Sequence, residues 1–245
     1  MHYVTQSEIK KMLDYEAGAC GLRIEHDLKE DSEPSAAMRQ GIYFEYLVTG
    51  APPRSGVVPE PERTLKGELT AAYKVIASQA ERVKTYLKRM GITYEAGIWQ
   101  QNEALMIGGH LDMVATSRGL GDCVIDLKYS GLLDNKWELY GWTWSAAQTA
   151  YHSIQARHYH LVTGLPFYYL VTESKEGGLV KLFKAEFGAG ALADHMALVD
   201  RTREFLKEME LGLNAVPEVT RCEACPLYEA CNHRSIYPEI NLINI

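Results

Sequence analysis

The sequence lacks several features that would assign it to common classes of protein. No apolar run approaches the length of a membrane span, and the polar N-terminus has no signal-peptide core. We therefore expect an intracellular, cytoplasmic protein with no membrane partner. There is also no excess of basic residues, because 25 Lys and Arg stand against 32 Asp and Glu, for a net charge of −7. This balance argues against a general nucleic-acid coat protein, but not against a nuclease, whose metals and local basic patches contact the phosphates.

Cysteine is scarce, and its spacing is informative. Five cysteines in 245 residues are an odd number for a disulfide scaffold and too few for this size, so metal ligation is the better interpretation. Three of them lie within ten residues near the C-terminus: Cys222, Cys225 and Cys231. Such a cluster is a strong metal signal with one ligand position open, for which Cys20, Cys123 and His233 are the candidates. Cys123 is expected in the sheet facing the core, where a buried thiol is ordinary.

The hydrophobic pattern predicts an α/β fold. At 47% hydrophobic, the chain can bury a full core, and nothing demands more than a single domain over residues 1–245. Helices are expected at 5–18, 32–50, 65–91, 137–162 and 191–212, and strands at 93–100, 104–115, 123–129, 166–173 and 179–187. Strands before and after a central helix give a mixed sheet flanked by helices, and no glycine-rich phosphate loop of the P-loop or dinucleotide type is present.

The segment from Gly108 to Lys128 reads as a β-hairpin that carries two acids and a lysine. Side chains alternate along a strand, so Asp126 and Lys128 share one face. If Asp112 pairs opposite Asp126, the loop is centred on Gly119, which lies inside the predicted turn. The turn therefore favours the register that brings the two acids together.

Two adjacent carboxylates repel each other unless a cation neutralises them. Hard oxygen ligands favour Mg²⁺ or Mn²⁺, and Lys128 could then hold the attacking water or the charge that develops on phosphorus. The alternative is a plain salt bridge of Asp112 or Asp126 with Lys128. An acid inside an apolar strand is costly to bury without a partner, and this favours the metal site.

Two helices carry further candidates. Glu45 follows Gly41 by one turn and has apolar and aromatic neighbours, so it is either partly buried and functional or an exposed surface acid. Gln148 lies in an aromatic-rich helix, where an amide needs a hydrogen-bonding partner. Tyr151, on the same helix, could equally be a core residue.

In their order along the chain, these motifs resemble the PD-(D/E)XK nuclease superfamily. Within it they resemble the iron-sulfur branch of RecB-type nuclease domains and CRISPR-associated or phage exonucleases. Glu45, with Gly41, is similar to the first motif, although many relatives have His there. Asp112 and the Asp126-x-Lys128 triplet match the two central motifs. The motif on the following helix is matched by Gln148 with Tyr151, and the one-plus-three cysteine pattern by Cys20, Cys222, Cys225 and Cys231.

The resemblance implies a restriction-endonuclease-like core and a Mg²⁺- or Mn²⁺-dependent DNA nuclease, expected to be an exonuclease acting on DNA ends or single strands in DNA processing or recombination. Its metal ligands would be Glu45, Asp112, Asp126 and the Leu127 carbonyl. Lys128 would position or activate the water, Gln148 would orient Lys128 or the water, and Tyr151 would contact the scissile strand.

The resemblance also implies that Cys20, Cys222, Cys225 and Cys231 hold a 4Fe-4S cluster, with zinc as the alternative, in a region that joins the two ends of the chain. Two other functions stay open: a CRISPR adaptation nuclease, and a non-catalytic DNA-binding or scaffold protein with a metal-stapled tail. A homo-oligomer is also possible.

Overall fold

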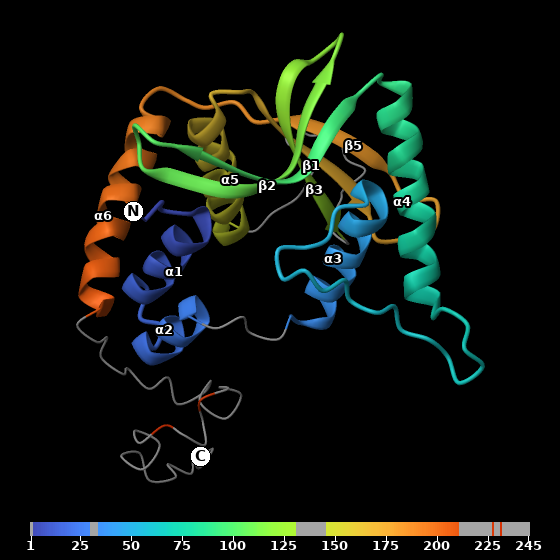
Figure 1. Cartoon of the computed structure of the whole chain (residues 1–245), viewed down its shortest axis with the longest axis horizontal. Coiled ribbons are helices and arrows are strands. Elements are labelled where there is room, and N and C mark those ends of the chain that lie inside the picture. Colours follow the sequence, from blue (N-terminus) through green and yellow to red (C-terminus); the bar gives the residue numbers. More distant parts are fainter. Residues whose placement is uncertain (1, 30–33, 131–145, 211–226, 228–230, 232–245) are drawn as a thin grey trace, which may run out of the picture. The chain divides into compact units, whose positions relative to one another are not determined.

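The structure is a computed structural model that describes residues 2–29, 34–130, 146–210, 227 and 231 (Figure 1). The chain divides into two compact units. One comprises Met1–Gln6 and Pro34–His195, and the other Ser7–Glu33 and Met196–Ile245. Among the described residues, no helix is both long and apolar enough to cross a membrane.

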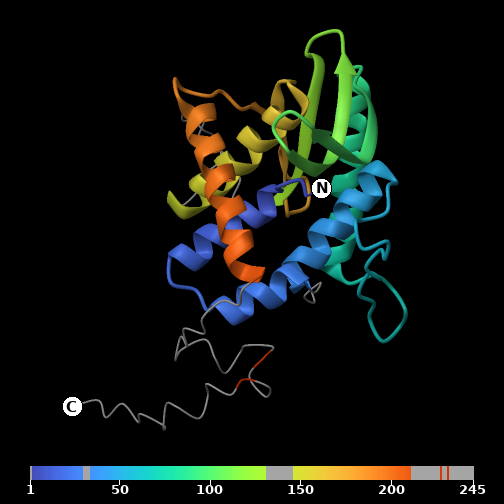
Figure 2. The ribbon, with the colours of Figure 1, turned by 60° about the vertical axis from the view of Figure 1, so that its left-hand side comes forward.

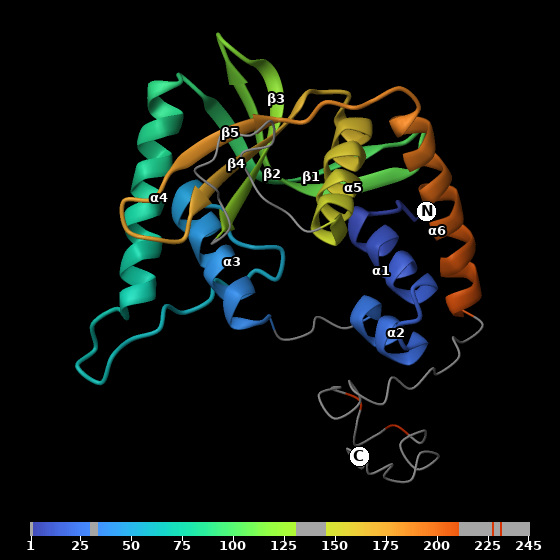
Figure 3. The ribbon, with the colours of Figure 1, turned by 180° about the vertical axis from the view of Figure 1, so that it is seen from behind.

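A five-stranded mixed sheet forms the centre of the first unit (Figures 1 and 3). Its strands follow one another in sequence order: β1 (Thr93–Asn102), β2 (Ile107–Ser117), β3 (Gly121–Ser130), β4 (Phe167–Glu173) and β5 (Val180–Lys184). All neighbours are antiparallel except β3 and β4, which are parallel. A parallel pair needs a long crossover, and helix α5 (Ala146–Thr163) lies in that connection. The prediction of a central mixed sheet flanked by helices is confirmed.

Helices cover the sheet on two faces, each with its own apolar cluster. Helices α3 (Ala36–Thr49) and α4 (Ala71–Arg89) lie side by side (Figures 1 and 2). Apolar residues of α4 recur every three or four positions, and they pack with α3 and one face of the sheet; they are Tyr73, Ile76, Ala80, Val83 and Leu87. Helix α5 packs its Ala156 and Tyr159 against Phe167, Tyr169 and Val171 of β4 on the other face.

The β2–β3 ladder is centred on Gly119, as predicted, because Met113 pairs with Ile125 and Ser117 with Gly121. The ladder ends at Met113 and Ile125, so the expected pair of Asp112 with Asp126 is not part of it. Most predicted elements have the right type but altered bounds. The helix expected at 65–91 begins only at Ala71, because Gly67 takes a left-handed turn (φ 79°). The arm expected from residue 104 begins at Ile107, after a turn in which Met106 has a positive φ. Residues 137–145 of the expected central helix lie outside the described part of the chain.

The second unit contains segments from both ends of the chain. It holds most of α1 (Gln6–Glu16) and α6 (Ala191–Glu210), and also α2 (Gly21–Lys29), which the sequence pattern did not predict. Met12, Ile24 and Phe205, one from each helix, form its buried core. The N- and C-terminal segments are therefore joined by apolar packing, and the prediction of a single domain stays a prediction.

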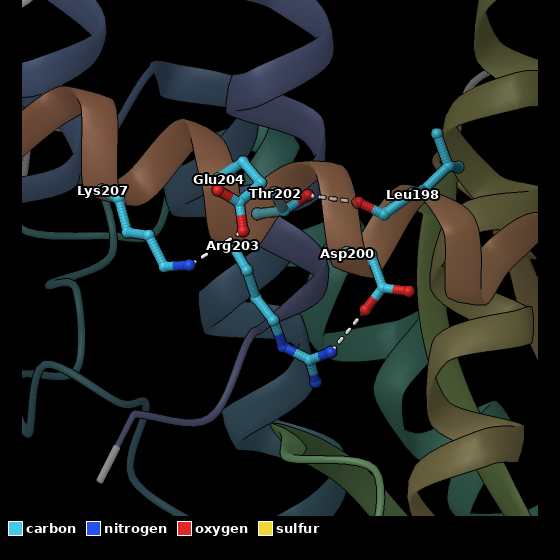
Figure 4. A network of polar contacts seen from close by, with 6 residues as sticks. All are labelled: Leu198, Asp200, Thr202, Arg203, Glu204 and Lys207. Carbon is cyan, nitrogen blue, oxygen red and sulfur yellow. Dashed lines mark hydrogen bonds and ion pairs between the residues drawn. The ribbon is translucent and has the colours of Figure 1, made fainter.

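Polar contacts supplement this core. The guanidinium of Arg201 pairs with Glu16, and Lys11 pairs with Asp27 at 2.6 Å. Along α6, an ion pair joins Arg203 to Asp200 and another joins Lys207 to Glu204, while Thr202 donates to the Leu198 carbonyl (Figure 4). The α6 pairs are exposed, so each adds little to stability.

A substitution at Gly109 measures how tightly the sheet packs on α5. A Cβ at Gly109 would lie 2.6 Å from the Tyr159 ring, whereas one at Gly119, in the β2–β3 turn, would meet nothing within 4 Å. Overpacking typically costs about 1 to 3 kcal/mol, and each kcal/mol lowers Tm by about 2 to 4 °C in a chain of this size. Thermal unfolding should therefore show a lower Tm for Gly109→Ala and an unchanged Tm for Gly119→Ala. Equal Tm values for both variants would contradict this packing.

Candidate active site

Two acids and a lysine meet where β2 and β3 pair. Asp126 is 1% exposed, and its side chain forms an ion pair with Lys128, two residues further along β3. Asp112 of β2 accepts a hydrogen bond from the Leu127 backbone N–H at 2.8 Å. Because Leu127 follows Asp126 directly, this hydrogen bond brings the Asp112 carboxylate to the segment of β3 that carries Asp126.

The strand is irregular at Asp112, and this irregularity sets the direction of its side chain. Leu111 packs in the cluster on the α5 side, whereas Met113, two residues later, packs in the cluster on the α3 and α4 side. Two such residues share a face on a regular strand, so the side-chain alternation shifts at Asp112. Opposite it, Gly97 of β1 has φ 65° and drops out of the ladder. A side chain at Gly97 would be strained and crowded, because its Cβ would lie 3.1 Å from Ala51.

Glu45 is brought to the same place by α3. The helix ends at Gly50, which has a left-handed φ of 72°, and it is held on the sheet by Phe44, whose ring stacks on Tyr129 of β3 at 5.1 Å. Glu45 is half-buried. Burial and then the negative charge of Asp126 raise the pKa of Glu45, and the charge of Glu45 in turn raises the pKa of Asp112, so the third carboxylate is within electrostatic reach of the other two.

The structure adds a glutamine that the sequence reasoning did not select. Gln155 of α5 is buried and donates to Asp126 Oδ1 at 2.6 Å. Tyr159, one turn later, is also buried, and burial together with the charges of Asp126 and Asp112 raises its pKa. Gln155 lies seven residues, or two helical turns, after Gln148, so both positions fall on one helix face and only packing distinguishes them.

Tyr169 of β4 is a second residue that the sequence reasoning missed. It pairs with Asp126 in the parallel β3–β4 ladder, and its hydroxyl donates to the His152 carbonyl at 2.7 Å. The Lys128 ammonium lies 5.6 Å from the centre of its ring. Lys128 is therefore held between a carboxylate and an aromatic face. The strand pairing that creates this contact cannot be read from a single sequence.

Burial and mutual repulsion together set the electrostatics of the cluster. Burial, then the charges of Asp126 and Glu45, raises the pKa of Asp112 well above its usual value. Burial, followed by the Asp126 charge, raises the pKa of Glu45 to about 7. Burial alone would lower the pKa of Lys128, but the neighbouring carboxylates more than offset it, so its pKa rises. Three acids against one lysine leave an excess of two negative charges when all are ionised.

The donor set suits a hard divalent cation, because it consists of carboxylates and its uncompensated charge is that of one such ion. Among the described residues, however, no three His, Cys, Asp or Glu side chains are arranged as a ready metal site. The hydrogen bonds explain this arrangement. Asp126 is engaged by Lys128 and Gln155, and Asp112 by the Leu127 backbone. Protein donors thus take up part of the charge that a cation would neutralise.

The remaining predicted residues are placed less fully. Gln148 and Tyr151 lie in the first turns of α5, but their side chains are outside the described part of the structure. Cys222 and Cys225 also lie outside it. Cys20 and Cys231 are half-buried free thiols, and both belong to the second unit. Cys123 is fully buried in the core, as expected.

Comparison with known proteins supports the fold. No protein-family model and no curated protein matches the chain. Among solved structures, it is similar to a "Putative exonuclease" from Eubacterium rectale, with 19% identity and a TM-score of 0.60 over 99% of this chain and 91% of that chain. An alkaline exonuclease from Laribacter hongkongensis matches at 14% identity over 85% of this chain and 93% of that chain, with a TM-score of 0.38. The first match shows a shared fold, in agreement with the predicted nuclease-like core.

Removing one charge from the cluster should stabilise the protein in the absence of metal. The pKa of Glu45 is raised from 4.5 to about 7, so the folded state loses stability as pH rises through this window. At pH 8 with EDTA, Glu45→Gln should therefore raise Tm, by about 2 to 4 °C for each kcal/mol of repulsion removed. At pH 4, where Glu45 is protonated, the two proteins should melt alike.

The matched control is Glu81→Gln, at an exposed acid of α4 that pairs with Lys84. Magnesium should raise the Tm of the parent at pH 8 and raise that of Glu45→Gln less. A Glu45→Gln protein that melts below the parent at pH 8 would contradict the repulsion.

Proposed function

We propose that this chain is a divalent-metal-dependent DNA nuclease of the PD-(D/E)XK type, acting as an exonuclease on DNA ends or single strands. One observation carries the proposal: three carboxylates from three separate elements act on one lysine, in a fold similar to that of the Eubacterium rectale protein titled "Putative exonuclease". Packing alone does not call for such a cluster, because buried like charges are costly. A cluster of this kind is typical of a functional site.

In phosphodiester hydrolysis, a water oxygen bonds to phosphorus, one P–O ester bond breaks, and the leaving oxygen takes up a proton. When bound, a Mg²⁺ or Mn²⁺ ion would polarise the phosphate and help to ionise the water. Glu45, Asp112, Asp126 and the Leu127 carbonyl would hold this ion. These four ligands are the ones that the sequence motifs predict.

The protein side chains would perform the remaining tasks. Lys128 is cationic and fixed between Asp126 and the Tyr169 ring, so its ammonium is suited to orient the water and to stabilise charge that develops on the phosphoryl oxygens. Gln155 holds one oxygen of Asp126, which fixes the rotation of that carboxylate. Gln148 and Tyr151, at the start of the same helix, would act on the water and on the scissile strand.

We further propose that Cys20, Cys222, Cys225 and Cys231 bind one metal centre, a 4Fe-4S cluster or zinc. Cys20 and Cys231 are uncombined thiols of the same unit, which leaves both available as ligands. The centre would be structural, because it would link a segment near the N-terminus to one near the C-terminus. Such a link restricts the unfolded chain most when the loop between its ends is long.

The catalytic prediction separates metal binding from chemistry. Asp126→Ala should lose both Mg²⁺-induced stabilisation and cleavage of end-labelled DNA. Lys128→Ala should keep DNA binding and lose cleavage, because Lys128 acts mainly in the transition state. Gln155→Ala should reduce turnover by roughly 10- to 100-fold, the usual size of a loss at a residue that supports a metal ligand.

The assay uses linear, circular and single-stranded DNA, each with Mg²⁺, Mn²⁺ or EDTA. Lys84→Ala on α4 is the control for the loss of a lysine outside the site. Cleavage of circles would indicate an endonuclease. Equal turnover by Lys128→Ala and the parent would refute the assignment, and an unchanged rate for Gln155→Ala would leave the supporting role to Gln148.

The cysteine prediction is tested by colour and metal content. Anaerobically purified protein with a 4Fe-4S cluster should be brown and contain about four iron atoms per chain. Cys20→Ser should bleach it and lower Tm, whereas Cys123→Ser should retain the colour, because Cys123 is enclosed in the core of the other unit. One zinc per colourless chain would select the alternative metal, and colour loss in Cys123→Ser alone would refute the ligand set.

A further inference from the structure

An exposed tryptophan lies next to the strand segment that carries Asp112. Trp99 of β1 is 39% exposed and is the one aromatic residue among the exposed large hydrophobic side chains of the described chain. The others are aliphatic: Met38, Val57, Leu65, Met90 and Leu179. A large apolar ring in contact with water marks a candidate binding surface when its position is fixed.

The Trp99 ring is fixed in three ways. Its Nε1 donates to Gln101 Oε1 at 3.2 Å, and His110, its partner in the β1–β2 ladder, packs edge-on with a centroid distance of 5.0 Å. The ring also lies on the backbone of Gly108, where a Cβ would come within 2.7 Å of it. The glycine thus lets one side of the indole rest on the strand while much of the side chain faces solvent.

A cation completes this surface. The loop that follows α3 passes beside β1, because a Cβ at Gly97 would lie 3.1 Å from the Ala51 Cβ and 3.9 Å from the Pro52 carbonyl oxygen. Arg54 follows two residues later in this loop, and Trp99 follows Gly97 by two residues on β1. Arg54 is exposed, and no acidic partner for it is found within the described residues. An aromatic face beside an exposed cation is complementary to a nucleobase and its phosphate.

The surface shares its supporting elements with the acid cluster. His110 precedes Asp112 by two residues, about 7 Å along β2. Ala51, which packs against Gly97 of β1, begins the loop that runs from α3 to Arg54. The same helix carries Glu45. A strand bound at Trp99 would therefore lie alongside the elements that bear Glu45 and Asp112.

We propose that Trp99, His110 and Arg54 form a docking surface for an unpaired stretch of DNA, with a base stacked on Trp99 and a phosphate on Arg54. This inference rests on the proposed nuclease function and deepens it by naming unpaired strands as the preferred substrate. In a duplex, base faces are covered by neighbouring bases, so a flat ring face selects bases that are free to stack. Stacking tolerates every base, so the surface distinguishes strand state and not sequence.

The test measures DNA affinity by fluorescence anisotropy in EDTA, on a single-stranded oligonucleotide, an overhang duplex and a blunt duplex. Trp99→Ala should weaken the first two about 5- to 100-fold, the range found when a stacking aromatic is truncated, and change the blunt duplex less than about twofold. Trp99→Phe should retain binding within about threefold, whereas Trp99→Leu, which is apolar but cannot stack, should behave like Trp99→Ala.

The salt dependence of DNA affinity distinguishes base stacking by Trp99 from phosphate binding by Arg54. Arg54→Ala should lower the slope of log affinity against log salt by about 0.7 for the single strand, whereas Trp99→Ala should leave the slope unchanged. The matched controls are Met90→Ala, at a similarly exposed hydrophobic residue (41%), and Arg89→Ala, both near the end of α4; neither should alter binding. Circular dichroism and Tm establish that each variant is folded.

The surface is refuted if Trp99→Ala binds single strands as tightly as the parent, or if the parent binds no DNA. It is also refuted if Met90→Ala loses as much affinity for single strands as Trp99→Ala, or if Trp99→Ala loses affinity for the blunt duplex to the same extent as for single strands. Cleavage with Mg²⁺ is measured separately on the same DNAs. Binding through Trp99 without any cleavage would contradict the nuclease proposal and support the surface. Cleavage with unaltered binding by Trp99→Ala would contradict the surface and support the nuclease.

Discussion

The repulsion among Glu45, Asp112 and Asp126 is the constraint on which the arrangement of the first unit depends. Burial and the nearby negative charges raise the pKa values of Glu45 and Asp112, and such a cluster destabilises a fold unless other interactions hold it in place. Here Lys128 neutralises one charge, and Gln155 and the Leu127 N–H hold individual oxygens. The apolar packing of the two clusters on either face of the sheet must offset the remaining free-energy cost of the buried charges.

Glycines let this charged site coexist with close packing. Gly97 permits the irregularity opposite Asp112, and without it the side-chain alternation of β2 would not shift at that acid. Gly109 allows the Tyr159 ring to approach the strand, which keeps α5 close enough for Gln155 to reach Asp126. Gly108 provides the flat backbone on which Trp99 rests. At Gly108 and Gly109 the absent Cβ leaves room for a neighbouring aromatic ring, whereas Gly97 permits a positive φ.

Local signals in the sequence predict the hairpin well and the helix faces poorly. The register of β2 and β3 follows from turn chemistry centred on Gly119 together with alternating side chains, so the placement of Asp112 and Asp126 was accessible. The choice between Gln148 and Gln155 was not, because both lie on one face of α5 and only the packing of the helix decides which reaches Asp126. The Tyr169 contact depends on a parallel pairing of Tyr169 with Asp126, 43 residues earlier in the chain. The sequence around α2 shows no clear cap or stop signal, so this helix was not predicted.

The raised pKa of Glu45 connects the electrostatics of the site to its proposed chemistry. With a pKa of about 7, Glu45 is about half protonated at neutral pH when no cation is present. A divalent cation binds the ionised form, so its binding must release protons, and its affinity must increase with pH through this window. The same residues that destabilise the metal-free protein at high pH would thus bind the ion most tightly there. The excess negative charge of the cluster therefore both lowers the stability of the metal-free protein and raises its affinity for the cation.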